Sequence, residues 1–121
     1  TKEHILRERE FKALGCDVRL ATDDGSRGFK GRVTELLEKE LSSHVPRPTS
    51  HVICACGPKP MLAALTSLAK KNDIPAYVSL EEFMGCGLGA CLGCVIRTTS
   101  GYKRICHDGP VFPASEVMWG K

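Results

Sequence analysis

The chain has 121 residues, of which 42% are hydrophobic and 26% are charged, and its formal net charge is +3. This composition is that of an ordinary globular domain. The basic residues are scattered and have no interleaved aromatic side chains, which argues against a nucleic-acid partner. No apolar run approaches the roughly 18 residues of a membrane span, and the first ten residues lack the apolar core of a signal peptide. We therefore expect a cytoplasmic protein with neither a nucleic-acid nor a membrane partner.

Helices and strands are predicted to alternate over residues 1–80. The first helix is predicted over 1–14 and stops at Gly15, and a strand follows over 16–22. A second helix over 31–44 precedes a strand over 51–56. A third helix opens in GPKP (57–60) and ends before Pro75, and the last strand covers 76–80. The helices show the 3.6-residue spacing of apolar side chains, and 51–56 is a short apolar run typical of a buried parallel strand. This order predicts an α/β fold with a parallel sheet covered by helices.

Residues 81–121 change in character, so we predict a domain boundary near Glu81. They contain a loop rich in glycine and cysteine, a hairpin over 94–106 with Ser100 and Gly101 at its turn, and an irregular tail that Trp119 is expected to anchor. Residues 1–80 supply three predicted strands and no G-x-G-x-x-G turn of a nucleotide-binding domain. We therefore expect residues 1–80 to be the C-terminal half of such a domain, and the chain to be a C-terminal portion of a longer protein.

Four of the seven cysteines follow a spacing that predicts a metal centre. The pattern is Cys86-x4-Cys91-x2-Cys94-x11-Cys106, the spacing of plant-type ferredoxins with a [2Fe–2S] cluster. Each iron takes two thiolates, so the loop would present three sulfurs and the far strand of the hairpin the fourth. The glycines between them let backbone N–H groups approach the cluster sulfurs.

The alternative of another class is a non-catalytic interaction domain stabilised by zinc. Structural zinc sites usually draw on two close ligand pairs, whereas this sequence has a single C-x2-C. His107 follows Cys106 directly, but it would point the opposite way if that segment were extended. For Cys16 and Cys54 we expect packing in the core.

Four segments, in this order, resemble the electron transfer subunit of class 1B dihydroorotate dehydrogenase, a family of ferredoxin–NADP reductase-like iron–sulfur flavoproteins. They are TDDGSRGFKGRVT (22–34), CGPKPM (56–61), SLEEFMGCGLGACLGCV (79–95) and ICHDGPVF (105–112). The resemblance implies a partial ferredoxin reductase-like NAD-binding domain over 1–80 and a [2Fe–2S] cluster-binding domain over 81–121. It implies that the four spaced cysteines are the cluster ligands.

The resemblance also implies a function in pyrimidine biosynthesis. In the family, electrons pass from the FMN of a dihydroorotate-oxidising catalytic subunit through the cluster and FAD to NAD. The family's FAD-binding barrel has no counterpart in these 121 residues, so we expect the chain alone to be inactive. Apolar surface left by the missing strands would favour self-association. The rival within redox chemistry is the reductase subunit of a related hydrogenase or ferredoxin–NADP system.

Two further segments are candidates for nucleotide contact. Cys56, Gly57 and Pro58 match the family motif beside the nicotinamide and flavin rings, and ligands of such sheets lie at the carboxyl ends of strands. The alternative is that Cys56 is a small buried residue ahead of a helix. The loop Thr22-Asp23-Asp24 also follows a predicted strand. It is either an Asp-rich turn with Gly25 at positive φ or a ribose-facing loop whose carboxylates would favour NAD over NADP.

Overall fold

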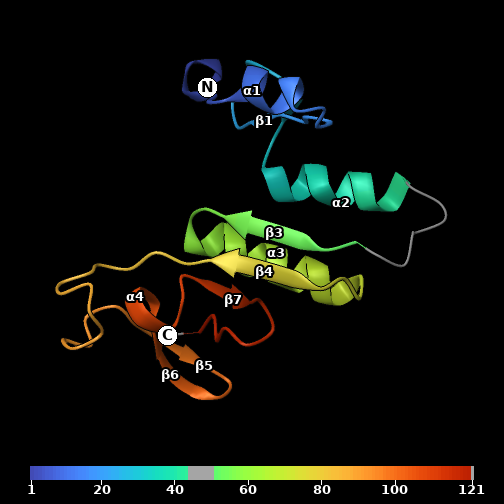
Figure 1. Ribbon diagram of the computed structural model, residues 1–121. Coiled ribbons are helices and arrows are strands. Elements are labelled where there is room, and N and C mark those ends of the chain that lie inside the picture. Colours follow the sequence, from blue (N-terminus) through green and yellow to red (C-terminus); the bar gives the residue numbers. More distant parts are fainter. Residues whose placement is uncertain (44–50, 121) are drawn as a thin grey trace. The chain divides into compact units, whose positions relative to one another are not determined.

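The computed structural model describes residues 1–43 and 51–120, and the chain forms two units, residues 1–46 and 47–121. Figure 1 colours both units along the sequence. No helix in the described part of the chain is long and apolar enough to cross a membrane.

The first unit holds a two-stranded parallel sheet and short helices. Its elements are η1 (Lys2–His4), α1 (Glu8–Ala13), β1 (Ala21–Thr22), β2 (Phe29–Lys30) and α2 (Val33–Ser43). The helix predicted over 1–14 is interrupted, because α1 begins only at Glu8 and ends at Ala13. Gly15, the predicted stop, has a φ of +80°, and the N–H groups of Gly15 and Cys16 bond back to the carbonyls of Lys12 and Phe11. The strand predicted over 16–22 is reduced to Ala21–Thr22, and its partner within this unit is β2. The alternation of apolar and polar residues did not reveal this partner.

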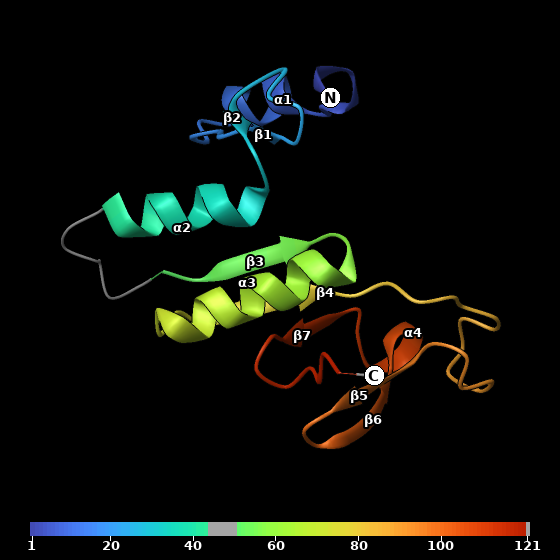
Figure 2. The ribbon, with the colours of Figure 1, turned by 180° about the vertical axis from the view of Figure 1, so that it is seen from behind.

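The second unit holds the sheet that carries most of the core. Its elements are β3 (Ile53–Cys56), α3 (Lys59–Lys71), β4 (Ala76–Ser79), β5 (Val95–Thr98), β6 (Gly101–Arg104), α4 (Ile105–Asp108) and β7 (Val111–Pro113). The sheet order is β3-β4-β7, with β3 and β4 parallel as predicted. Helix α3 covers one face of β3 and β4 (Figures 1 and 2) and buries Leu62, Leu65, Leu68 and Ala69.

Strand β3 differs from the buried strand that its apolar run predicts. Ile53 and Ala55 are partly buried, whereas Cys54 and Cys56 are exposed. Within this unit α3 covers a single face of the strand, so side chains on the other face stay accessible. Cys16, in the first unit, is exposed as well. The prediction that Cys16 and Cys54 pack in the core was therefore wrong.

The C-terminal segment returns to the sheet as β7, which pairs antiparallel with β4. Phe112 lies opposite Val78 in this pairing, and both are almost fully buried. Backbone contacts therefore cross the boundary predicted near Glu81, where the sequence changes in character. The predicted hairpin is β5 and β6, with Thr98 opposite Gly101 across the turn.

Candidate metal centre

The four spaced cysteines come from two places in the second unit. Cys86, Cys91 and Cys94 lie on the loop that follows β4, the yellow-to-orange segment in Figure 1, and Cys106 lies in helix α4. The sequence placed Cys106 on the far strand of the hairpin, but β6 ends at Arg104 and the chain turns at once into one helical turn. That correction matters because the helix turns the N–H of Cys106 toward Cys94.

Cys86 and Cys91 form one pair, called here the loop pair. The Sγ atom of Cys86 accepts the N–H groups of Leu88 and Cys91, each at 3.4 Å. Hydrogen bonds lower the pKa of Cys86 to about 6. The largest effect comes from the N–H of Cys91, the next from the N–H of Leu88, and a smaller one from the Cys91 thiol. Backbone dipoles thus stabilise a thiolate at this position.

Cys94 and Cys106 form a second pair, called here the hairpin pair. The N–H of Cys106 donates to the Sγ atom of Cys94 at 3.4 Å, and the N–H of the fully buried Ile105 donates to the Cys94 carbonyl at 3.1 Å. The N–H of Cys106 lowers the pKa of Cys94, and the Cys94 thiol raises the pKa of Cys106. Cys94 is only 2% exposed, so the hairpin pair is fixed by the core.

The described residues place the four cysteines as two separate pairs and not as one compact set of ligands. Within residues 1–43 and 51–120, no three cysteine, histidine or carboxylate side chains lie close enough together to hold one ion. Two thiol pairs match the two thiolates that each iron of a [2Fe–2S] cluster takes. Backbone N–H groups already point at Cys86 and Cys94, and the N–H of Gly93 points at the Sγ atom of Cys91 at 3.4 Å. Such bonds offset the negative charge of an iron–sulfur cluster.

The structure adds polar residues that the spacing of the cysteines did not reveal. Arg104 and Asp108 lie on either side of Cys106 and form an ion pair at 3.2 Å. His107 contacts Asp108 at 2.9 Å, and it lies on a helical turn rather than on the extended segment considered above. The backbone N–H of Arg104, then His107 and the Arg104 side chain, hold the pKa of Asp108 far below its usual range. The signal in the sequence that could have revealed the ion pair is the spacing of Arg104 and Asp108, two opposite charges four residues apart.

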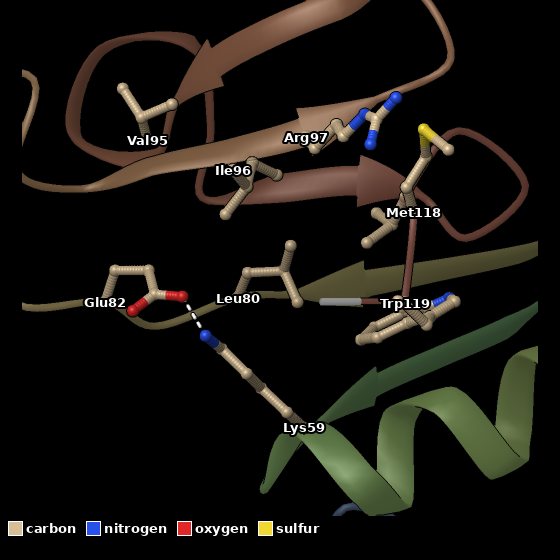
Figure 3. Close-up of a pocket in the computed structure, with 10 residues that line it drawn as sticks. Lys59, Leu80, Glu82, Val95, Ile96, Arg97, Met118 and Trp119 are labelled. Atoms are coloured by element: carbon tan, nitrogen blue, oxygen red, sulfur yellow. Dashed lines mark hydrogen bonds and ion pairs between the residues drawn. The ribbon is translucent and has the colours of Figure 1, made fainter.

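The Cys56-Gly57-Pro58 turn joins β3 to α3, as expected. Gly57 has a φ of +153°, and a Cβ atom there would collide with the Cε atom of Met61. Cys56 is exposed, which does not fit the alternative of a buried packing residue. Beside the turn, Lys59 forms an ion pair with Glu82 (Figure 3).

The Lys59–Glu82 pair borders a cavity of about 220 Å³ that contains Leu80 and Trp119 in its lining (Figure 3). The indole Nε1 of Trp119 is buried and has no hydrogen-bond partner among the described residues. The position of Trp119 in this lining agrees with the expected role of anchoring the tail.

The Thr22-Asp23-Asp24 loop belongs to the first unit, where Thr22 is the last residue of β1. Thr22 is buried, and its hydroxyl donates to the Arg27 carbonyl at 2.9 Å. The Asp24 carboxylate accepts hydrogen bonds from the Ser26 N–H at 3.0 Å and from the Ser26 hydroxyl at 2.7 Å. The bond from the hydroxyl contributes most to lowering the pKa of Asp24, and the bond from the N–H comes next. Asp23 makes no hydrogen bond or ion pair with any residue that the structure describes. The turn geometry is thus explained without a ligand, and the nucleotide role stays a prediction.

Comparisons with known proteins agree on one family. Residues 81–118 match the family model of the iron–sulfur cluster binding domain of dihydroorotate dehydrogenase B. The chain is 47% identical over 121 residues to the electron transfer subunit of dihydroorotate dehydrogenase B (NAD(+)) from Geobacillus thermodenitrificans, covering 98% of this chain and 44% of that protein. It is 51% identical over 119 residues to the subunit homolog from Aquifex aeolicus, with the same coverages.

A solved structure supports the fold assignment. The structure of an NADH-dependent reduced ferredoxin–NADP oxidoreductase matches with a TM-score of 0.81 and 33% identity, covering 98% of this chain and 41% of that chain. The chain spans less than half the length of the curated relatives it matches. Residues 81–118 are thus an iron–sulfur cluster binding domain of the dihydroorotate dehydrogenase B type, and the chain as a whole is similar to the C-terminal part of the electron transfer subunits of that enzyme.

Proposed function

We propose that this chain binds a [2Fe–2S] cluster through Cys86, Cys91, Cys94 and Cys106 and serves in an electron transfer subunit of dihydroorotate dehydrogenase. The observation that carries the proposal is the arrangement of these cysteines as two thiol pairs, each with a backbone N–H directed at a sulfur. We assign the loop pair to one iron and the hairpin pair to the other.

When bound, the cluster supplies one-electron transfer between the FMN of a dihydroorotate-oxidising subunit and the FAD that serves NAD, in a cytoplasmic step of pyrimidine biosynthesis. The residues of this chain hold and shield that centre. The N–H groups of Leu88, Cys91 and Gly93 offset thiolate charge on the loop side. On the other side, Ile105 anchors the hairpin pair to the core.

Exposed apolar side chains on the cysteine loop support the proposal of a protein partner. Phe83 and Leu88 are 93% and 82% exposed, and Leu92 is exposed as well. Exposed apolar surface of this kind is a feature of interaction sites on soluble domains. We propose that this loop docks on the FMN-containing catalytic subunit. In the absence of that partner, the same surface would favour self-association of the chain.

The nucleotide contacts are proposed from the resemblance. Cys56, Gly57 and Pro58 would lie beside the nicotinamide and flavin rings, and the exposure of Cys56 at the carboxyl end of β3 supports this role. Thr22, Asp23 and Asp24 would border the NAD ribose. The division into a nucleotide-binding portion, 1–80, and a cluster portion, 81–121, is proposed on the same basis.

The experiment that tests the cluster is metal analysis of the chain purified without air or chelator. We expect about two iron atoms and two acid-labile sulfides per chain with a red-brown absorbance. Cys91→Ser should bleach the spectrum, whereas Cys16→Ser, an exposed cysteine of the other unit, should leave it intact. A colourless protein with stoichiometric zinc would refute the proposal.

The rival reductase roles are tested by the electron donor. The relatives named above are dihydroorotate dehydrogenase subunits at 47% and 51% identity, which favours that assignment. With a purified FMN-containing catalytic subunit, dihydroorotate should bleach the cluster absorbance of this chain within one turnover. Reduction by ferredoxin or hydrogenase, with none by dihydroorotate, would assign the chain to those systems instead.

A further inference from the structure

The loop pair and the hairpin pair are held by different parts of the second unit. The loop pair is held by hydrogen bonds within its own loop, from Leu88 and Cys91 to Cys86. The hairpin pair is held by the buried Ile105 and by the pairing of β5 with β6. A cluster that takes two thiolates from each pair requires a fixed distance between them. Some contact must therefore connect the loop to the hairpin.

Arg104 makes that connection with its side chain. Its Nη1 atom donates to the carbonyl oxygen of Gly89, in the middle of the loop, at 3.0 Å. Its Nε atom donates to Asp108 at 3.2 Å, and Asp108 in turn accepts the backbone N–H of Arg104 at 2.7 Å. One guanidinium thus joins Gly89, 15 positions before Arg104 in the sequence, to Asp108 of helix α4.

Close packing at Gly89 strengthens this connection. Gly89 has a φ of +81°, and a Cβ atom there would lie 3.1 Å from the Cβ atom of His107 and 3.3 Å from Nη1 of Arg104. Helix α4 therefore lies directly against the backbone of the loop. The planar guanidinium can bond Gly89 and Asp108 together because its donors form a rigid fork, which the single ammonium of lysine lacks.

The charge of Arg104 also lies close to the proposed ligands, because Arg104 is two residues before Cys106 and its guanidinium bonds the loop at Gly89, between Cys86 and Cys91. A cation beside the cluster ligands favours the more negative, reduced form of the centre. The side chain therefore has two separable effects, one of geometry and one of charge.

We propose that Arg104 is a positioning residue that holds the loop pair in register with the hairpin pair through its simultaneous bonds to Gly89 and Asp108. The proposal rests on the cluster function proposed above. Arg104 is not itself a ligand, and it acts by holding the segments that bear the ligands.

The test compares three variants of the cluster-loaded chain: Arg104→Gln, Arg104→Lys and Lys103→Gln. Lys103 is the neighbour of Arg104 on β6, and its side chain lies on the opposite face of the hairpin because successive strand residues alternate. Lys103→Gln removes the same charge as Arg104→Gln without touching Gly89 or Asp108. Iron release to a chelator, the midpoint potential and the electron paramagnetic resonance spectrum of the reduced protein are measured for each.

We expect Arg104→Gln to lose iron about tenfold faster than the wild-type chain, as for other residues that orient metal ligands, and to have a more negative midpoint potential. Arg104→Lys should release iron nearly as fast as Arg104→Gln, because it loses the forked donors of the guanidinium. It should keep the wild-type midpoint potential, because it keeps the positive charge. Lys103→Gln should match the wild type in iron release. Equal iron release by Arg104→Gln and Lys103→Gln would overturn the proposal.

The outcomes also separate this proposal from the one on which it rests. A wild-type chain without iron would refute the cluster function, whereas a loaded wild type with unchanged Arg104 variants would refute the role of Arg104 alone. If Arg104→Gln fails to fold, as judged by Trp119 fluorescence, Arg104→Lys carries the test. Iron release from Arg104→Lys at the wild-type rate would then overturn the proposal.

Discussion

Two glycines of the cysteine loop show how the same backbone conformation can serve different purposes. Gly87 and Gly89 have φ values of +67° and +81°, which residues with a side chain rarely adopt. A Cβ atom at Gly87 would meet nothing within 4 Å, whereas one at Gly89 would press on His107 and Arg104. The sequence shows that both positions are glycine, but only the structure separates a requirement for conformation from a requirement for space.

The first residue-scale prediction compares Gly89→Ala with Gly87→Ala. Both variants bear the penalty of a left-handed backbone, about 1–2 kcal/mol. Only Gly89→Ala also pushes α4 away from the loop, so it should release iron to a chelator several times faster than Gly87→Ala. Iron release followed by the loss of visible absorbance measures the difference. Identical rates for the two variants would show that α4 does not need close contact with the loop.

At the scale of the element, the sequence was informative where a local signal exists. Apolar spacing predicted α2 and α3, and Gly15 predicted the end of α1. The parallel pair β3 and β4 followed from two short apolar runs around a helix. These features depend on side chains that are close in the sequence, so the pattern contains the needed information.

The features that the sequence missed depend on distant partners. The return of β7 to β4 and the exposure of Cys54 are set by which element lies alongside. At the candidate site, the spacing predicted which cysteines gather. It did not reveal that Cys106 sits on a helical turn or that Arg104 reaches Gly89. Such contacts are tertiary, and no local period encodes them.

The element-scale prediction concerns β7, which ties the cysteine-bearing segment to the sheet. Phe112 is 4% exposed on this strand, while its neighbour Val111 is 56% exposed. Phe112→Ala should lower the free energy of unfolding by about 3 kcal/mol or more, because it leaves a cavity against Val78. Val111→Ala should change it by no more than about 0.5 kcal/mol. Urea denaturation followed by the fluorescence of Trp119, the only tryptophan, measures the second unit.

A comparable loss of stability in both variants would contradict this view of β7. A small effect of Phe112→Ala would mean that the cysteine segment folds independently of the β3–β4 sheet. In that case the segments before and after the boundary predicted near Glu81 would unfold independently.

At the scale of the whole molecule, the candidate residues are distributed over both units. The cluster cysteines and the Cys56 turn belong to residues 47–121, and the Thr22-Asp23-Asp24 loop belongs to residues 1–46. The relatives that the chain matches are more than twice as long. NAD-dependent function is therefore tested in a hybrid subunit, in which this chain replaces the matching C-terminal part of the Geobacillus thermodenitrificans protein.

The last prediction is that this hybrid prefers NADH to NADPH by one to two orders of magnitude in kcat/KM, equivalent to about 1.4–2.8 kcal/mol. The physical reason is repulsion between the carboxylates of the Asp23-Asp24 loop and a 2′-phosphate. The Asp24 carboxylate is held in place by Ser26, whereas Asp23 has no such bond among the described residues, so Asp23 is the residue that can turn toward a bound nucleotide. Asp23→Asn should therefore weaken the preference, while Asp17→Asn, which removes an exposed carboxylate paired with Arg19 in the same unit, should not. Equal kcat/KM for NADH and NADPH in the unmodified hybrid would remove this loop from the nucleotide site and leave it as the Asp-rich turn that its hydrogen bonds already explain.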